Sequence, residues 1–594
     1  MSSADNDGYL LPEAADQFWV DSFGVGRDEF EESTHAPFPK GYITLAQDIV
    51  RQSGVVELLD KWITEDTAGK RGGGYKPHIS FEAALVVLVM HGIASGFAPS
   101  YKTMGTTLSR RIGPEAAAQL GIPFLPKESW YFKIYGPLRN VLKAIDPDYF
   151  PKYKPTRLGG TPIAERVNRR RRLTPAEYQE VLDNRDPERQ AILRARADTF
   201  MNLLVQTSVK LAGKHVQNWK GNSALDATFV EVGGHTTYDS SGALKGLHGD
   251  PDAGRYSHAR TDHDGSKTTK SDGWGYELEI TTMLRNHPDE KPTFPLMVTA
   301  VNYHKPGKIT HAAPDMFRRL AHCGYPAGLI AVDLAYSSLT EENFYAPLVE
   351  LGHTFAFDYK KSVRNKPFSQ LGLQASWEWL IQVDGQFYIA GMPETAINAT
   401  WDHATGQITN KQLDERLEER ERYRLTPKAR MDNHGYQRFS VPDPNTYDEL
   451  VDMKTGEIRE KPTVKSITVP PEAGLKFRQK YPYKSKDQIR WYGMRSLVEH
   501  SNSFFKDGAH EALGDPRRRF GKGWAYQYLM ATVAVVSSNI RKITDFYRRL
   551  ERPRIGTSDN RDTPTATRAY RRQHRLAVQA KTTDGRTTRY PKRN

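Results

Sequence analysis

Four polar residues near the C-terminal end of the chain have types and spacing that could act together on a phosphate substrate. They are Tyr492, Arg495, Glu499 and Lys506, in the stretch WYGMRSLVEHSNSFFK. The stretch lacks proline and predicts one helix over 491–506, on which the four side chains fall within an arc of roughly 60°. The opposite face is apolar, so the predicted helix is amphipathic. The simpler interpretation of the polar face is a solvated surface with an Arg495–Glu499 ion pair.

Two upstream aspartates lie where predicted strands could bring them together. Asp226 lies in the apolar and β-branched run NSALDATFVEV, and Asp333 lies near the end of the run GLIAVDL. The pattern from 222 onward predicts three strands, then a helix, a strand, a helix and a strand ending at 359. This is the order of an RNase H-like core, in which a mixed five-stranded sheet is packed with helices. Its first and fourth strands are central neighbours, so we expect Asp226 and Asp333 to converge, with Glu499 approaching from the later helix.

Three carboxylates in one place predict a site for divalent cations. Close carboxylates raise one another's pKa unless cations neutralise their charge. Mg2+, with Mn2+ as a substitute, is the hard cation that such oxygen ligands prefer. Two ions per site could activate a water or a 3′-hydroxyl and stabilise the leaving oxygen in a displacement at phosphorus. We therefore expect Asp226, Asp333 and Glu499 to be both catalytic and metal-binding.

The spacing Tyr-x2-Arg-x3-Glu-x6-Lys resembles the YREK signature of the IS4-type DDE transposases, and all four positions match. The resemblance covers roughly residues 220–550 and includes the form Asp-x-x-Tyr at Asp333 and Tyr336, although the common version is Asp-Arg-Gly-Tyr. It implies a DNA transposase that cleaves and transfers strands. It also implies that Tyr492, Arg495 and Lys506 contact DNA phosphates near the cleaved end.

The same resemblance implies an insertion between the second aspartate and the glutamate. We expect the domain order to be a leader (1–40), an all-α N-terminal region (41–215) for DNA binding, the first part of the core (220–360), a β-rich insertion subdomain (361–485), the C-terminal core helices (486–550) and a basic disordered tail (551–594). Some family members stack a flipped base on a tryptophan of the insertion. Trp377, Trp379 and Trp401 are candidates for that contact, although alternating tryptophans are also ordinary strand residues.

Two further groups are weaker candidates. Lys270 and Tyr276 resemble a turn before the second strand that could touch DNA. The segment 247–272 is rich in Gly and Ser, and its histidines and aspartates could form a zinc site. Their spacing fits no helix or strand pair, so a solvated loop is the favoured interpretation; the residues are His248, His258, Asp262, His263 and Asp264.

Charge and composition narrow the class of protein. The chain has 594 residues, a formal net charge of +13 and one cysteine, Cys323. Excess positive charge favours a polyanionic partner, here double-stranded DNA in the form of transposon ends and target DNA. A lone cysteine excludes a disulfide framework and suits a reducing cytoplasm. We expect a cytoplasmic protein, nucleoid-associated while it acts, without membrane contact and dimeric on DNA by resemblance.

Three alternatives compete with the transposase interpretation. A catalytically silent DNA-binding relative would share the fold, but the intact set of three carboxylates argues against it. Another RNase H-like nuclease would use the same carboxylates, but the YREK spacing and the insertion argue against it. A structural nucleic-acid-binding protein would explain the positive charge but not the pattern of carboxylates.

Overall fold

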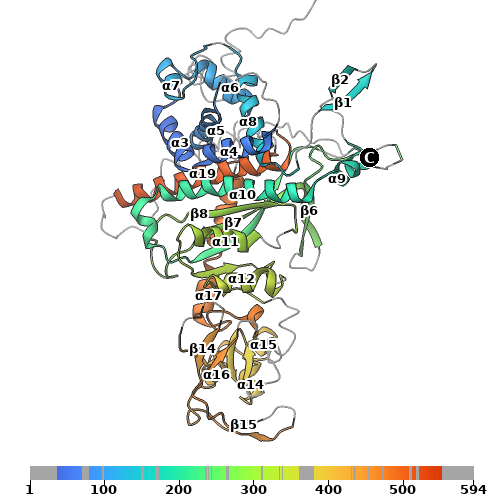
Figure 1. Ribbon diagram of the computed structural model, residues 1–594. Helices are drawn as coiled ribbons and strands as arrows, with labels where there is room; N and C mark the ends of the chain where they lie inside the picture. Colours follow the sequence, from blue (N-terminus) through green and yellow to red (C-terminus); the bar gives the residue numbers. More distant parts are fainter. Residues whose placement is uncertain are drawn as a thin grey trace, which may run out of the picture.

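The computed structural model places the N-terminal helices at one end of an elongated molecule, a sheet in the middle and the insertion at the other end (Figure 1). The described residues are 37–69, 79–95, 100–126, 128–148, 153–158, 161–166, 173–234, 237–238, 240–241, 244–261, 267–308, 312–333, 335–336, 339–359, 380–429, 431–432, 436–451, 455–470, 473–507, 511–516, 519 and 521–551. The predicted basic tail and nearly all of the predicted leader lie outside them. None of the described helices is long and apolar enough to cross a membrane.

The central sheet is mixed and makes the chain an α/β protein. Its strands are β3 (Ser223–Glu231), β6 (Gly254–Thr261), β7 (Lys267–Met283), β8 (Val298–His304), β9 (Leu329–Val332) and β10 (Thr354–Ala356). The order is β10–β9–β3–β7–β6, and β8 also pairs with β7. Strands β9 and β10 run parallel to β3, whereas β7 is antiparallel to β3, β6 and β8.

The sheet has six strands rather than the predicted five. Strand β7 begins at Lys267. Its first half, up to Gly275, pairs with β6, and its second half, from Glu277, pairs with β8. The expectation of a solvated loop over 247–272 is therefore wrong, because most of that segment belongs to a long hairpin. Because the segment is rich in Gly, Ser and Thr, it lacks the apolar alternation of a core strand. The first part of β7 is instead held by its pairing with β6.

Helices surround the sheet. Helices α10 (Pro187–Lys210) and α19 (Trp524–Glu551) run beside the edge strand β8, and α11 (Ala312–His322) packs against β7 and β8 with α12 (Ala346–Glu350) next to it (Figure 1). Two buried amides fix β8 to the first pair. The Asn202 side chain exchanges hydrogen bonds of 2.9 and 3.0 Å with the backbone of Val301. The Asn539 side chain does the same with Val298 at 2.8 and 2.9 Å, and the two amides so satisfy backbone groups of β8, which among the described strands pairs with β7 alone.

The N-terminal helices pack on α10 and α19. They are α3 (Lys40–Gln52), α4 (Val55–Thr67), α5 (Phe81–Ser95), α6 (Tyr101–Arg110), α7 (Pro114–Gln119) and α8 (Tyr131–Ile145). The apolar residues of 44–65 recur at the spacing of one helix, but α3 and α4 are separate because Gly54 takes a left-handed conformation (φ 67°) between them. Helix α5 is capped by Ser80, whose Oγ accepts the Ala83 N–H at 3.1 Å. The region is not all-α, because β1 (153–158) and β2 (161–166) form a hairpin.

Two helices join this region to the sheet along the chain. Helix α9 (Pro175–Asp183) begins after Thr174, which forms a capping box with Glu177. Helix α10 follows after Asp186, whose side chain accepts backbone N–H groups of its first turn. Thr174 and Pro175 therefore have the roles that their order in the sequence predicts.

The described part of the insertion is mixed α and β rather than largely β. Its strands are β11 (Leu380–Val383), β12 (Gln386–Ile389), β13 (Thr426–Pro427), β14 (Gln437–Ser440), β15 (Leu450–Val451), β16 (Ile458–Arg459) and β17 (Ser466–Val469). Its helices are α14 (Glu394–Ile397), α15 (Ala399–Ala404) and α16 (Asn410–Glu421). Arg420 on α16 forms a fully buried ion pair with Asp384 and so ties the helices to the β11–β12 turn.

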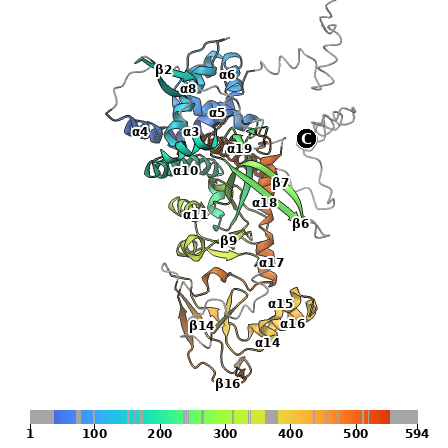
Figure 2. The ribbon, with the colours of Figure 1, turned by 90° about the vertical axis from the view of Figure 1, so that its right-hand side faces the viewer.

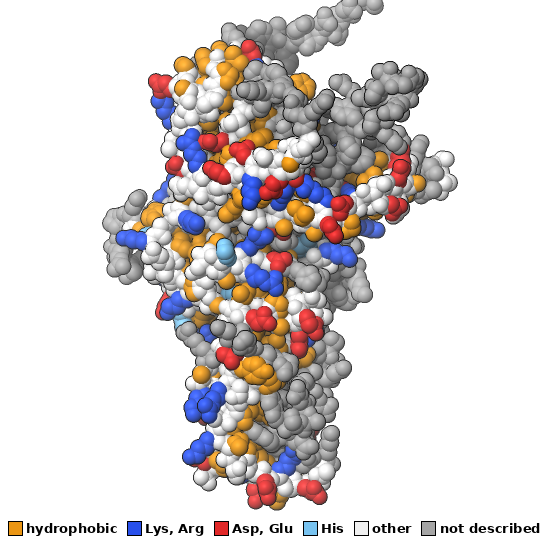
Figure 3. Space-filling model, viewed as in Figure 1, with side chains coloured by type: hydrophobic (Ala, Val, Ile, Leu, Met, Phe, Trp, Pro, Cys, Tyr) orange, Lys and Arg blue, Asp and Glu red, His pale blue; other side chains and the backbone are white. Residues whose placement is uncertain are grey.

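Charged side chains of both signs cover the visible surface. In Figure 3, Lys and Arg side chains extend from the N-terminal helices to the insertion, and Asp and Glu side chains lie among them. The net positive charge is therefore not gathered into one patch on this face.

Candidate active site

Asp226 and Asp333 lie on neighbouring central strands. Asp226 lies within β3, and Asp333 directly follows β9, which pairs with β3 in parallel. The pairing places Leu225 opposite Val332, so the residue after each of these lies at the same level of the sheet. The predicted convergence of two aspartates from the first and fourth core strands thus matches the geometry.

Glu499 approaches from a helical segment that differs from the prediction. The single helix expected over 491–506 is two helices, α17 (Lys486–Gly493) and α18 (Ser496–Lys506). Between them the backbone bonds shorten to i−3 spacing, with Arg495 N–H donating to Tyr492 at 2.9 Å and Val498 N–H to Arg495 at 3.0 Å. This tight turn follows Gly493, which lowers the helix propensity there. The two helices follow one another from the insertion to the sheet (Figure 2).

Arg495 lies in this turn and connects two of the carboxylates. Its Nη2 atom lies 2.8 Å from Glu499 Oε1, and its Nη1 atom lies 3.9 Å from Asp333 Oδ1. The guanidinium also lies 5.6 Å from the centre of the Tyr492 ring. Arg495 is mostly buried, whereas about half of the Glu499 side chain is exposed (52 %). The predicted polar face is therefore a real cluster, with the arginine as the counter-ion of the carboxylates.

Asp226 is the most buried carboxylate of the three. Its pKa is raised to about 6, first by burial and then by the charges of Asp333 and Glu499, against the opposing effects of the Ala227 backbone and Arg495. Because each of these charges acts on Asp226, the three carboxylates share one electrostatic environment. The site therefore concentrates negative charge that one arginine only partly neutralises.

Asn502 is a member of the site that the sequence interpretation missed. Its Nδ2 atom donates a hydrogen bond of 2.8 Å to Asp226 Oδ2. Its Oδ1 atom is buried and has no hydrogen-bond donor among the described residues. The signal was present in the sequence, because Asn502 lies three residues after Glu499 and interrupts the apolar face between Val498 and Phe505. A polar residue at such a position needs a buried partner.

The remaining residues of the predicted polar face lie along the two helices. Tyr492, half-buried in α17, has its pKa raised by burial. Lys506 is exposed at the last residue of α18, seven residues after Glu499 and so on the same side of the helix. Tyr492 is therefore in contact with the cluster through Arg495, whereas Lys506 lies two helical turns beyond Glu499.

Other predicted contacts fall elsewhere. Tyr276 is fully buried, and its hydroxyl donates to Asp250 at 3.0 Å, so the prediction that it touches DNA is wrong. His248 is buried against the Trp274 ring, and its Nδ1 accepts the Asp250 N–H at 3.1 Å. Trp401 is half-buried in α15. The other candidate side chains lie outside the described residues; they are Trp377, Trp379, Lys270, His258, Asp262, His263 and Asp264.

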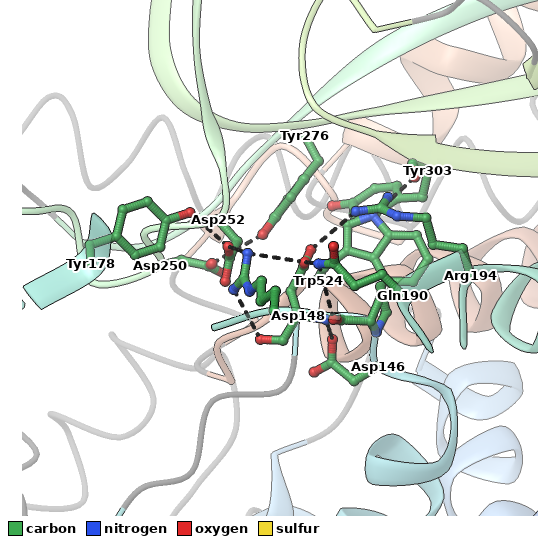
Figure 4. A network of polar contacts seen from close by, with 12 residues as sticks. Asp146, Asp148, Tyr178, Gln190, Arg194, Asp250, Asp252, Tyr276, Tyr303 and Trp524 are labelled. Atoms are coloured by element: carbon green, nitrogen blue, oxygen red, sulfur yellow. Dashed lines mark hydrogen bonds and ion pairs between the residues drawn. The ribbon is translucent and has the colours of Figure 1, made fainter. Parts of the chain in front are cut away.

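A second carboxylate cluster lies where the N-terminal helices meet the sheet (Figure 4). Two Asp-Pro-Asp turns, 146–148 and 250–252, face each other there. Arg185 joins them, with Nη1 at 3.2 Å from Asp148 and 2.8 Å from Asp252. Asp250 accepts the Gly523 N–H at 2.8 Å. Burial raises the pKa of Asp146 to about 7 and that of Asp250 to about 6.

The contacts of this second cluster indicate a structural junction. Its carboxylates are engaged by arginine, tyrosine, glutamine and backbone donors that come from four different parts of the chain. Tyr178 donates to Asp252 at 2.7 Å and Gln190 to Asp148 at 2.8 Å. The cluster therefore fastens α8, α9, α10 and the start of α19 to the sheet.

The oxygen donors of the first cluster are of the kind that a hard divalent cation takes. As they stand, Asp226, Asp333 and Glu499 are not arranged to hold one, since no group of three or more such side chains among the described residues is. The pKa of Asp226 is raised first by burial and then by the neighbouring charge of Asp333. A cation bound there would take over the role that Arg495 has with Glu499 and Asp333. The chain matches no known family model, and no curated protein matches it either. The function of the chain is therefore inferred from the geometry of this site.

Proposed function

We propose that the chain is a DNA transposase of the DDE class with an RNase H-like core. One observation carries the proposal: Arg495 contacts both Asp333 and Glu499, while the charges of both carboxylates act on Asp226. Residues 226, 333 and 499 thus meet from β3, β9 and α18. The strand order β8–β7–β3–β9–β10, with β9 and β10 parallel to β3, supports the RNase H-like assignment.

In this proposal Asp226, Asp333 and Glu499 hold two Mg2+ or Mn2+ ions. The ions supply activation of a water or 3′-hydroxyl and stabilisation of the leaving oxygen. The protein residues bind and orient the DNA. Arg495, if it were not paired with Glu499, would present two N–H groups that can bind a phosphate. Asn502 keeps Asp226 oriented while its charge is shared.

The partners in this proposal are transposon ends and target DNA. Tyr492 and Lys506 border the cluster on the two helices and are suited to contact phosphates on either side of the cut. The formal net charge of +13 supports a polyanionic partner. A dimer that pairs two ends is part of the same proposal, and the N-terminal helices are its candidate for binding the ends.

The test is cleavage of donor DNA that carries the element's own ends, taken from the sequence flanking its coding region. Wild type, Glu499→Gln and Ser503→Ala are compared with Mg2+ and with Mn2+. Ser503 is exposed on the same helix and serves as the control. We expect metal-dependent cuts at the ends with wild type and Ser503→Ala, and none with Glu499→Gln, which should bind the ends as tightly as wild type.

Two outcomes contradict the proposal. If wild type binds the ends but cuts them with neither metal, the protein is a silent DNA-binding relative in which Arg495 permanently neutralises the carboxylates. If Glu499→Gln cuts as well as wild type, Glu499 is not a metal ligand.

A further inference from the structure

The stretch of chain that leads from the insertion into α17 is strongly basic. Residues 476–490 read KFRQKYPYKSKDQIR and contain six Lys and Arg residues against a single acidic residue, Asp487. Among the described residues, Arg490 is the one of these cations that forms an ion pair, with Asp289 at 3.2 Å. The other five cations thus present positive charge that no carboxylate neutralises by direct contact within the described chain.

Arg478 is the least satisfied of these cations. Its guanidinium lies 5.1 Å from the Phe387 ring, and its Nη1 donates a 3.6 Å hydrogen bond to Met431 Sδ. Its Nε and Nη2 atoms are shielded from solvent and have no acceptor in the described structure. Burial lowers the pKa of Arg478 to about 10. A thioether is a weak acceptor, so an anion could displace it and complete the hydrogen bonding of the guanidinium.

Arg478 and Lys480 flank a residue that is fixed to the end of the sheet. The side chain between them, Gln479, is buried, and its Oε1 accepts the Phe357 N–H at 3.2 Å. The Lys480 N–H donates to the Phe355 carbonyl at 3.0 Å. The backbone that links the two cations is therefore held beside β10. Lys480 is exposed, with Nζ 5.5 Å from the Trp491 ring centre.

The two cations lead toward the carboxylate cluster. Trp491, which Lys480 contacts, precedes Tyr492 in α17, and the Tyr492 ring lies under Arg495. Figure 2 shows α17 and α18 running in one line from the insertion toward the sheet. Arg478, Lys480 and Arg495 thus follow one another from the insertion to the proposed site of cleavage.

The aromatic residues beside these cations are not available to bases. The rings of Tyr481 and Trp491 stack on each other, with centres 6.2 Å apart and planes 20° apart. The Trp491 residue is 5 % exposed. A nucleic-acid strand that passes Arg478 and Lys480 would therefore be held through its phosphates and not by stacking of its bases.

We propose that Arg478 and Lys480 bind neighbouring phosphates of the DNA strand that enters the site formed by Asp226, Asp333 and Glu499. The inference rests on the proposed function, because that function names DNA as the substrate. The contact is independent of base sequence. It adds one phosphate contact for each cation and holds the strand between the insertion and Arg495.

The test measures binding of the full-length protein to a DNA duplex of mixed sequence, without metal, over a series of salt concentrations. The variants are Arg478→Met and Lys480→Gln. The control is Lys411→Gln, which removes one cation from the exposed face of α16 (88 % exposed side chain). We expect each of the two test variants to bind several-fold more weakly and to lower the steepness of the log–log salt dependence by about 0.9. The control should match wild type.

Thermal stability separates this role from a structural one. Arg478→Met removes a buried cation that has no counter-ion, so its melting temperature should equal or exceed that of wild type. A parallel loss of stability and binding in Arg478→Met, or an unchanged salt dependence in both test variants, would overturn the proposal. Because no metal is present, failure of the cleavage test with Glu499→Gln leaves these binding results interpretable by themselves.

Discussion

Replacing Asn502 by alanine removes a side-chain amide that donates to Asp226. The hydrogen bond is 2.8 Å long, and its acceptor is the carboxylate whose pKa is already raised to about 6. A donor stabilises the charged form of a carboxylate, so its loss should raise the pKa of Asp226 further. Alanine also removes the buried Asn502 Oδ1 atom, which has no donor in the described structure, so the variant should fold.

The size of the effect follows from the energy of the bond. A hydrogen bond to a charged group contributes about 1.5–3 kcal/mol, which corresponds to about 1–2 pKa units. The pKa of Asp226 would then lie at or above neutral pH, and a proton would compete with the cation for the carboxylate. At pH 7 we expect the Mg2+ or Mn2+ concentration for half-maximal binding to rise about two- to tenfold. The defect should shrink above pH 8, where Asp226 is ionised again.

The assay is a Mn2+ titration by calorimetry at pH 6.5, 7.5 and 8.5, repeated with DNA cleavage as the readout. Ser503→Ala, on the exposed side of α18, is the matched control. A loss of affinity in Asn502→Ala that is the same at every pH would refute the argument, since it would show a distortion of the site and not a change in the pKa of Asp226. Identical behaviour of the two variants would refute it as well.

Two further predictions concern stability. Burial raises the pKa of Asp146 to about 7, so the folded state binds a proton that the unfolded state releases. The stability that this proton contributes is fully present below the pKa that Asp146 has in the unfolded chain, and it is lost as the pH rises toward 7. The free energy of unfolding of Asp146→Asn should therefore rise relative to that of wild type between pH 5 and pH 8, by at most about 1.4 kcal/mol per pH unit. Urea unfolding at each pH measures this difference, and a difference that stays constant with pH would contradict the prediction. Arg420→Met should destabilise the protein by about 3–5 kcal/mol, because it leaves Asp384 buried without its counter-ion. Arg416→Met, at a more exposed pair with Asp402, should cost about 1 kcal/mol or less, and equal denaturation midpoints for the two variants would show that burial does not matter here.

The sequence pattern predicted the elements that bury a regular apolar face. Strands β3, β8 and β9 and helices α5, α11 and α19 lie where the periodicity of apolar residues indicates, because a buried face leaves a period in the sequence. The predicted spacing of Tyr492, Arg495 and Glu499 survives in the structure as one cluster around the arginine. The chemistry assigned to that cluster stays a proposal.

Features that depend on contacts far apart in the chain were not predictable. Strand β6 pairs with a Gly- and Ser-rich part of β7, and neither segment has the apolar pattern of a core strand. The turn at Arg495 lies inside an otherwise continuous amphipathic pattern, and only the backbone hydrogen bonds show it. Similarly, Asp146 and Asp250 lie about a hundred residues apart, so local patterns contain no sign that their turns meet.

The most direct measurement is the position of Mn2+ in crystals of the protein with DNA, located by anomalous scattering. The proposed function predicts two peaks enclosed by Asp226, Asp333 and Glu499, with Arg495 turned away from Glu499 toward a phosphate. Bound DNA with Arg495 still paired to Glu499, and no Mn2+ peak between the three carboxylates, would contradict it.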